Sequence, residues 1–399
     1  MIFGGKFAAC LKIGRVIVPL GLRLARWSSL SRRLIGSAPR RREVLSAEAL
    51  AAALHRAIFD REPEGGAWSR AVGLHPSSQA VEGVIRTMIG SAEFRTRMLK
   101  SLVPQVDLPD LTLLMPDRYV LEQVPGGPLR VYIAGSDEGI ADMARLIETH
   151  RYYDRFGAAT PVIDLDKEIT AAIVSGLGAR SCFELGCFTG TVLSLLADRG
   201  LRVLGAEASH LAFVFACANI RASMLYGDLL SLPIQERFDV VLCMDVLEHL
   251  SPLRLDAYLE KLLSLLDDDG YLYVNSPMFG GDATFGTVEA PYLAEWQSVS
   301  DASYWRHWPC DERGWPLHGH LIWASPGWWT RKFASHGLTR DPVIENAIHL
   351  QLGGFFDYAI GRRSLFVLRR AANRNDSAAL AAQVTAALSQ VPGIPGKRT

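Results

Sequence analysis

The stretch Ser181-Cys-Phe-Glu-Leu-Gly-Cys-Phe-Thr-Gly190 contains a short apolar run, an acidic residue and two glycines, and a second apolar run from Thr191 to Ala197 follows it. The first run has the length of a buried strand, and the second has the spacing of a helix. A strand that passes through a glycine turn into a helix builds a nucleotide pocket, because the turn lets the backbone approach the ligand and the helix N-terminus offers free N–H groups. We therefore expect an α/β domain organised around this turn.

The glycine spacing differs from that of dinucleotide-binding turns. The pattern Gly-x-Gly-x-x-Gly is absent, which speaks against a nucleotide-dependent oxidoreductase or epimerase. The chain instead has Glu184, Gly186 and Gly190, with Phe188 in the middle of the turn. This arrangement resembles motif I of class I S-adenosylmethionine-dependent methyltransferases, and the resemblance implies S-adenosyl-L-methionine as the cofactor.

Two acidic residues end the strands expected after the turn. Glu207 closes an apolar run that begins at Leu201, and an acid at that place can accept hydrogen bonds from both ribose hydroxyls of an adenosine. Asp228 follows the run 222–226. The resemblance assigns Asp228 to the adenine amino group and Leu229 to the face of the adenine ring.

The most specific match is Phe238–Leu250, where a buried run leads into Asp245-Val-Leu-Glu-His249. A helix, a turn and a strand follow over residues 262–274. Five such elements in order, at βαβ spacing, support the resemblance as a set. The cofactor contacts that it implies are Glu184, Gly186, Cys187, Gly190, Glu207, Asp228, Leu229 and Asp245, with Glu184 at the methionyl amino group. Tyr152 and Tyr153, in the preceding region, are further candidates for contacts.

The resemblance implies a Rossmann-like, seven-stranded methyltransferase sheet with an antiparallel last strand and helices on both faces. We assign this α/β domain to residues 161–371. The last two strands are expected at Asp341–Ile348 and Ser364–Arg370. Residues 372–399 then form a C-terminal helix and a flexible tail.

A sulfonium methyl group is already activated, so the protein mainly has to align donor and acceptor and exclude water. A general base is needed only for a poor nucleophile such as a sugar hydroxyl. His249 and His320 are the candidates, because histidine takes a proton near neutral pH. Packing is the alternative role for both. The bulky Phe188 motivates a second alternative, a catalytically inactive methyltransferase-fold scaffold in a glycan-assembly complex.

Residues 276–330 hold seven of the nine tryptophans and are expected to form a substrate lid. Flat indoles suit the apolar faces of sugars, so a sugar or glycan-related small molecule is the expected acceptor. A quinone, a lipid or a small acid is an alternative acceptor, and a core internal to the insertion is the alternative role of the tryptophans. The spacing of His307, Cys310, His318 and His320 is irregular, so no metal is expected.

The residues before the catalytic domain divide into three segments. Residues 105–160 read as a linker, a hairpin with strands at Tyr119–Val124 and Leu129–Ala134, and a helix from Asp137 to about Tyr153. Residues 44–104 form a small all-α domain. Its Arg61-Glu-Pro-Glu-Gly-Gly, Trp68 and Ser91-x-Glu-Phe94 resemble a domain of unknown function related to phycobilisome linkers. The resemblance implies docking to a protein partner or assembly, and a generic helical cap is the alternative.

Residues 1–43 form a basic arm with no acidic residue before Glu43. The arm allows contact with an anionic membrane surface, and a disordered tail is the alternative. The chain as a whole carries no net charge, which argues against a nucleic-acid partner. Six cysteines without Cys-x-x-Cys spacing, and no apolar run of membrane-spanning length, predict a cytoplasmic protein, with the inner face of the membrane as a peripheral site.

Overall fold

The computed structural model describes residues 107–124, 126–157, 161–287, 303–304 and 307–395. The chain divides into two compact units, Met1–Arg95 and Thr96–Thr399, and all described residues belong to the second. The predicted basic arm and the predicted helical domain of residues 44–104 therefore lie outside the described residues. Among the helices that the structure describes, none combines the length and the apolarity needed to cross a bilayer.

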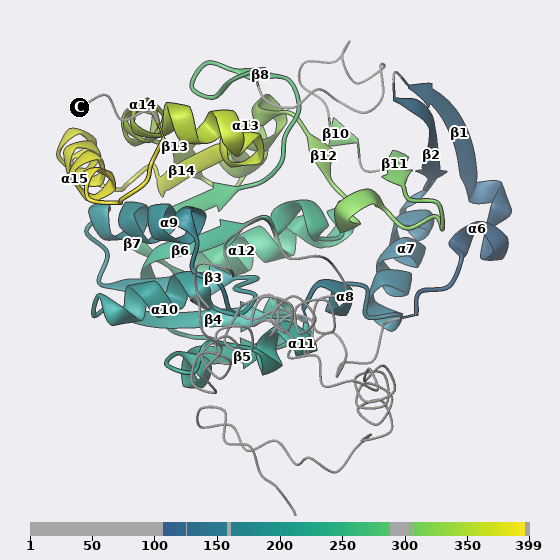
Figure 1. Ribbon diagram of the computed structural model, residues 1–399, viewed down its shortest axis with the longest axis horizontal. Helices are drawn as coiled ribbons and strands as arrows, with labels where there is room; N and C mark the ends of the chain where they lie inside the picture. Colours follow the sequence, from purple (N-terminus) through teal and green to yellow (C-terminus); the bar gives the residue numbers. More distant parts are fainter. Residues whose placement is uncertain (1–106, 125, 158–160, 288–302, 305–306, 396–399) are drawn as a thin grey trace, which may run out of the picture. The chain divides into compact units, whose positions relative to one another are not determined.

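A seven-stranded sheet forms the centre of this unit, in the order β13-β14-β7-β6-β3-β4-β5 (Figure 1). Its strands are β3 (Ser181–Leu185), β4 (Arg202–Glu207), β5 (Met224–Tyr226), β6 (Phe238–Met244), β7 (Leu266–Asn275), β13 (Leu338–Arg340) and β14 (Leu365–Arg370). The strands from β7 to β5 pair in parallel, whereas β14 is antiparallel to both β7 and β13. The predicted sheet with an antiparallel last strand is confirmed.

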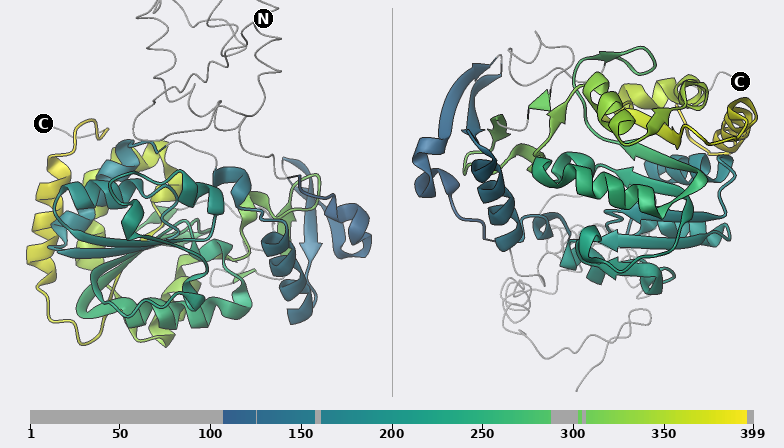
Figure 2. Two further views of the ribbon diagram at one scale, coloured as in Figure 1. Left: turned by 90° about the horizontal axis from the view of Figure 1, so that it is seen from below. Right: turned by 180° about the vertical axis from the view of Figure 1, so that it is seen from behind.

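Helices cover both faces of the sheet (Figure 2). The α-helices are α6 (Leu111–Leu114), α7 (Asp137–Thr149), α8 (Asp154–Gly157), α9 (Leu165–Gly176), α10 (Thr191–Asp198), α11 (His210–Val214), α12 (Leu255–Leu265), α13 (Pro326–Ser335), α14 (Pro342–Tyr358) and α15 (Ser377–Ser389). Short 3₁₀ helices include η3 (Leu229–Ser231), η4 (Leu247–His249), η5 (Pro252–Arg254), η7 (Leu317–Gly319) and η8 (Ile360–Arg362).

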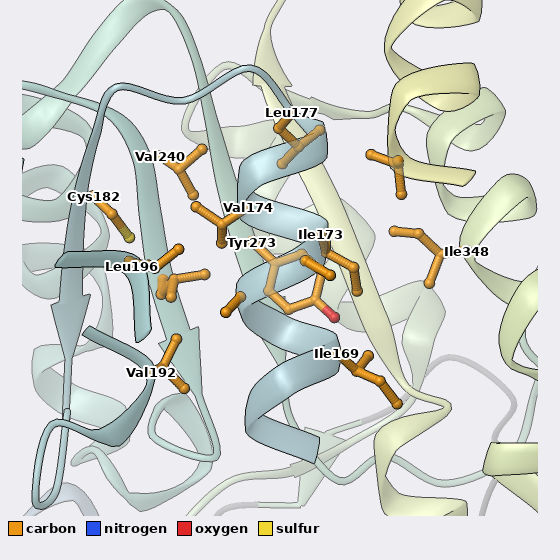
Figure 3. Close-up of a cluster of buried hydrophobic side chains, with 14 of the residues drawn as sticks. Ile169, Ile173, Val174, Leu177, Cys182, Val192, Leu196, Val240, Tyr273 and Ile348 are labelled. Atoms are coloured by element: carbon orange, nitrogen blue, oxygen red, sulfur yellow. The ribbon is translucent and has the colours of Figure 1, made fainter. Parts of the chain in front are cut away.

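The alternation of side chains along β6 shows how one strand serves two cores. Val240 and Leu242 point into the core under α9, α10, α14 and α15, where Figure 3 shows Ile173 of α9 and Ile348 of α14. Val241 points to the opposite face, into the core under α12 and α13. This period of two follows from the pleat of the strand, and burial on both faces requires apolar residues at every position.

A smaller sheet joins segments that are far apart in the sequence. The predicted hairpin is present as β1 (Tyr119–Val124) and β2 (Gly127–Ile133), and β11 (His307–Cys310) pairs antiparallel with β2. Trp308 of β11 stacks on Tyr132 with ring centroids 5.3 Å apart. The remaining short strands are β8 (Gly281–Asp282), β9 (Gly286–Thr287), β10 (Ser303–Tyr304) and β12 (Trp323–Ala324). The hairpin, α7 and part of the aromatic-rich insertion thus share one core.

The described tryptophans of the insertion are mostly core residues. Trp308, Trp315 and Trp323 lie in the core shared with the hairpin, and Trp329 lies in the core under α12 and α13. Trp328 is partly buried against the second of these cores. The remaining tryptophans of this segment lie outside the described residues. The described indoles therefore fill the interior, but in cores shared with the hairpin and with the large sheet rather than in a core internal to the insertion.

The strand predicted at Asp341–Ile348 is wrong. Strand β13 ends at Arg340, and α14 begins at Pro342. The Asp341 side chain accepts a hydrogen bond from the N–H of Ile344, and proline occupies the first helical position, where its missing N–H has no cost. The N-cap and the proline favour the start of a helix. They outweigh the apolar residues from which a strand was predicted. The helix predicted from Asp137 ends at Thr149, earlier than expected.

Candidate active site

The turn between β3 and α10 has glycine at two positions where the backbone is left-handed and a side chain would clash. Gly186 and Gly190 have φ angles of +67° and +71°. A Cβ atom would lie 2.4 Å from Val246 Cγ2 at Gly186 and 2.4 Å from Ile220 Cδ1 at Gly190. Gly190 is also the N-cap of α10 and has no side chain to bond the first N–H groups of the helix. The turn therefore presents backbone, rather than side chains, to a ligand.

The two residues inside the turn point in different directions. Cys187 is buried, and its sulfur lies so close to β4 that a Cβ atom on Gly205 would be only 2.6 Å from it. The ring of Phe188 is 39% exposed and belongs to no described core. The N–H of Phe188 donates to Glu207 Oε2 at 2.7 Å. The bulky side chain is thus partly exposed rather than packed into a core of the described residues.

Glu184 lies within β3, directly before the turn, and is buried. None of the described residues donates a hydrogen bond to its Oε2 atom. Burial raises the pKa of Glu184 to about 8, an effect that nearby Lys167 opposes and Glu207 reinforces. A buried carboxyl without a partner is costly, so this oxygen fits a bound cation such as an ammonium group.

Glu207 ends β4, the neighbour of β3, as predicted. Its two oxygens accept hydrogen bonds from the N–H groups of Phe188, at 2.7 Å, and Ser209, at 2.6 Å. Burial raises the pKa of Glu207, although these bonds partly offset the effect. Glu207 thus holds the glycine turn by a hydrogen bond from the adjacent strand.

Asp228 caps η3, and its carboxylate is already bonded within the protein. Tyr258 O–H donates to Oδ1 at 2.6 Å, and the Arg254 guanidinium pairs with Oδ2 at 2.5 Å. Burial opposes ionisation, but these two partners outweigh it and lower the pKa of Asp228. The next residue, Leu229, is buried in the core under α12. Contact of both residues with adenine stays a prediction.

Asp245 follows β6 and has a positive φ of 52°. Its carboxylate pairs with Arg362 of η8, a residue that the sequence analysis missed. Arg362 also contacts Asp166 of α9 through Nε at 3.0 Å and Asn275 Oδ1 of β7 at 2.8 Å. Arg362 lies in the short connection between α14 and β14, where a single arginine gives no local signal of such a role.

The two predicted general-base candidates, His249 and His320, contact each other. The ring centroids of His249 and His320 lie 4.8 Å apart. Burial lowers the pKa of His249, and burial together with His249 and His318 lowers the pKa of His320 to about 2. Both imidazoles are therefore neutral at neutral pH and carry a free lone pair.

Glu248 adds a buried carboxyl to these histidines. The side chain is fully buried, and its Oε2 accepts a hydrogen bond of 2.9 Å from Ser276 O–H. Its Oε1 lies 3.9 Å from His249 Nε2. The carbonyl oxygen of Glu248 accepts N–H groups from Leu321 and Ile322, which ties the segment after β6 to the segment after η7. Tyr153, a predicted cofactor contact, instead donates its O–H to the carbonyls of His249 and Gly319.

Part of the chain is similar to known methyltransferases. Residues 183–270 match the family model described as a methyltransferase domain. The chain is 27% identical to the ubiquinone biosynthesis O-methyltransferase of Pseudomonas fluorescens over 109 residues, 25% of this chain and 47% of that protein. The counterpart from Bradyrhizobium diazoefficiens is 28% identical over 133 residues, 30% of this chain and 49% of that protein. The chain thus spans about half the length of these curated relatives.

Solved structures of methyltransferases are also similar to the chain. The CcbJ methyltransferase from Streptomyces caelestis is 18% identical, with a TM-score of 0.35, over 54% of this chain and 92% of that one. Residues 183–270 thus match a methyltransferase domain, and they lie within the seven-stranded sheet that was predicted for the class I methyltransferase fold.

Proposed function

We propose that the protein transfers the methyl group of S-adenosylmethionine to a hydroxyl oxygen of a small molecule. The observation that carries this proposal is the buried, unpartnered Oε2 of Glu184 beside a turn in which Gly186 and Gly190 leave the backbone open. The names of the curated relatives, which are O-methyltransferases, support oxygen as the methylated atom.

The residues at the turn suit the parts of the cofactor, which supplies a methyl group already activated on a sulfonium. Glu184 is suited to the methionyl ammonium, because a cation would give its Oε2 a partner. Glu207, on the adjacent strand, is suited to the ribose hydroxyls. Asp228 and Leu229 are the proposed adenine contacts, and the hydrogen bonds from Tyr258 and Arg254 would hold Asp228 in one orientation.

A hydroxyl acceptor must lose its proton when it is methylated. The neutral imidazoles of His249 and His320 lie together, with ring centroids 4.8 Å apart. His249 is the better suited of the two to accept the proton of the hydroxyl, because the pKa of His320, about 2, makes that imidazole a weak base. The other task of the chain is to orient the acceptor and to exclude water.

The acceptor class is the finer part of this proposal. A sugar or glycan-related hydroxyl was expected from the tryptophans, but the described tryptophans fill cores rather than line a surface. The curated relatives are named for ubiquinone biosynthesis, so a phenolic hydroxyl of a quinone precursor has equal support. Both classes therefore belong in the first set of acceptors to be tested.

The experiment is calorimetry with S-adenosylmethionine, followed by transfer of a labelled methyl group to panels of sugars and phenols. We expect heat of binding in the natural protein, much weaker binding in Glu184→Gln, and labelled product with one panel. Binding without product in either panel would contradict the proposed acceptor. If no heat is seen at millimolar ligand, the alternative of an inactive methyltransferase-fold scaffold is favoured instead.

A further inference from the structure

We propose that Glu248, His249 and His320 form a binding site for a divalent transition-metal ion of the zinc class. The three side chains come from two segments, the end of η4 and the residue after η7. One ligand atom from each side chain lies within 4.8 Å of those of the other two. Spacing in the sequence alone does not reveal this group, because His320 is remote from the other two residues.

Two buried atoms of the cluster lack a hydrogen-bond partner among the described residues. They are Glu248 Oε1 and His320 Nδ1. Glu248 is fully buried and His320 is only 8% exposed, so water does not readily replace the missing partners. A carboxylate oxygen and an imidazole nitrogen that face no donor are both electron-pair donors. A cation between them would satisfy both atoms at once.

The third ligand atom is prepared by the groups around it. His249 Nδ1 lies 3.2 Å from the carbonyl oxygen of Gly319, so an N–H at Nδ1 donates to this carbonyl and leaves the lone pair on Nε2. That Nε2 atom is the one that lies 3.9 Å from Glu248 Oε1. Ser276 holds the other oxygen of Glu248. Metal sites in proteins have such outer partners, which orient each ligand.

Gly319 makes this arrangement possible. Its φ is +79°, and a Cβ atom there would lie 2.7 Å from Tyr152 and 2.9 Å from Tyr153. Tyr153 O–H donates to the same carbonyl that His249 Nδ1 contacts. The glycine thus lets a backbone carbonyl approach both a tyrosine and a histidine closely, and the orientation of His249 depends on it.

The ligand set selects the kind of metal. Two imidazoles and one carboxylate suit zinc and neighbouring transition metals, whereas calcium and magnesium prefer oxygen ligands throughout. Three protein ligands leave one position of a tetrahedral site for water or for an oxygen of a substrate. The side chain of His249 is 22% exposed, which places the accessible edge of the cluster at this residue.

The metal would also change how the acceptor is activated, a role that rests on the proposed methyl transfer. A lone pair that binds a metal cannot also accept a proton, so His249 and His320 would act as ligands rather than as general bases. A substrate hydroxyl in the open position would lose its proton to solvent water, because a bound metal lowers the pKa of a coordinated oxygen. Glu248, His249 and His320 would hold the ion, and the ion would supply the lowered pKa of the acceptor hydroxyl; the O–C bond then forms as the bond from the methyl carbon to the sulfonium sulfur breaks, which leaves S-adenosylhomocysteine.

The test uses the full-length protein without an affinity tag, treated with a chelator and then titrated with Zn²⁺ in a calorimeter. Titration with Co²⁺, followed by visible absorption, reports directly on imidazole ligands. We expect one ion per chain. His320→Ala and Glu248→Gln should each weaken Zn²⁺ binding by tenfold or more and change the Co²⁺ spectrum. Ser276→Ala, which removes an outer partner, should weaken binding by roughly tenfold.

The matched control is His336→Gln. His336 forms a histidine–carboxylate pair with Asp256 at 2.7 Å and is not part of the cluster, so its substitution should not change the stoichiometric binding. Equal Zn²⁺ affinity in His320→Ala and the natural protein, or no binding to either, would overturn the proposal. Because Glu248 is buried, circular dichroism must show that Glu248→Gln folds. If Glu248→Gln does not fold, the Zn²⁺ affinity of His320→Ala alone tests the metal site. Zinc binding without binding of S-adenosylmethionine would leave the metal site standing and remove the proposed function.

Discussion

Asp245 and Arg362 form an ion pair between the end of β6 and η8, 117 residues apart in the chain. The arginine also holds Asp166 and Asn275, so it joins α9 and the ends of two strands beside the glycine turn. The pair keeps Asp245 in a backbone conformation with positive φ, which residues other than glycine rarely adopt.

Arg362→Met should therefore weaken binding of S-adenosylmethionine as well as the fold. We expect a loss of about 1 to 2 kcal/mol in the free energy of unfolding, less than for a fully buried pair, because the Asp245 side chain is 39% exposed. Urea unfolding and calorimetry measure the two effects. Arg363→Met is the control, since Arg363 pairs with Asp357, whose side chain is 72% exposed, rather than with Asp245. Equal losses in both variants would contradict the role given to Arg362.

Glu184 should make stability depend on pH. Burial raises its pKa to about 8 in the folded chain, from an ordinary value of 4.5. Between these pH values the folded chain holds a proton that the unfolded chain has lost, so the free energy of unfolding falls as pH rises, by up to about 1.4 kcal/mol per pH unit. Glu184→Gln should remove this contribution, and its stability should fall less from about pH 5 to about pH 8. Thermal unfolding across this range, without ligand, makes the comparison.

The same carboxyl should make cofactor binding pH-dependent. A cation favours the ionised form of Glu184, so the affinity for S-adenosylmethionine should increase from about pH 6 to about pH 8 in the natural protein. In Glu184→Gln the affinity should be lower and should lack this increase. Calorimetry at several pH values compares the affinity of the natural protein with that of Glu184→Gln. A parallel increase in both proteins would mean that another group binds the ammonium.

Gly186→Ala should damage the turn through a steric clash and not only through backbone strain. The new methyl group would lie 2.4 Å from Val246 Cγ2. We expect a loss of about 1 to 3 kcal/mol in the free energy of unfolding and no detectable cofactor binding. Gly200→Ala is the matched control, because Gly200 also has a positive φ, of 87°, but no atom within 4 Å of an added Cβ. Gly200→Ala should lose only the smaller part of the free energy of unfolding that comes from backbone strain, and it should still bind the cofactor.

Trp308 should connect the hairpin to the histidine cluster. Its indole N–H donates to the carbonyl of Leu321 at 2.8 Å, next to His320. Trp308→Phe should lose about 1 kcal/mol, from this hydrogen bond, while the stacking on Tyr132 is kept. Trp308→Ala should lose about 3 to 5 kcal/mol. The larger loss is expected because alanine leaves a cavity, so equal losses of stability in urea would contradict this prediction.

Much of the sheet could be predicted because its signals are local. The glycine turn and the acid at Glu207 follow from the alternation of apolar runs with turns, and they lie where the sequence placed them. The failure at Asp341–Ile348 also has a local reason, since a cap and a proline specify a helix where only apolar content was counted. In contrast, no local pattern pairs Arg362 with Asp245 or brings His320 to Glu248. These contacts depend on loops whose position only the folded chain defines.

The pairing of β2 with β11 also has a consequence for how the chain is made. The ribosome releases Gly127–Ile133 long before it has translated His307–Cys310, so the hairpin must wait for its third strand. Until then Tyr132, which is fully buried in the finished protein, is uncovered. A product truncated before the insertion would keep this surface open and would be prone to aggregate and be degraded.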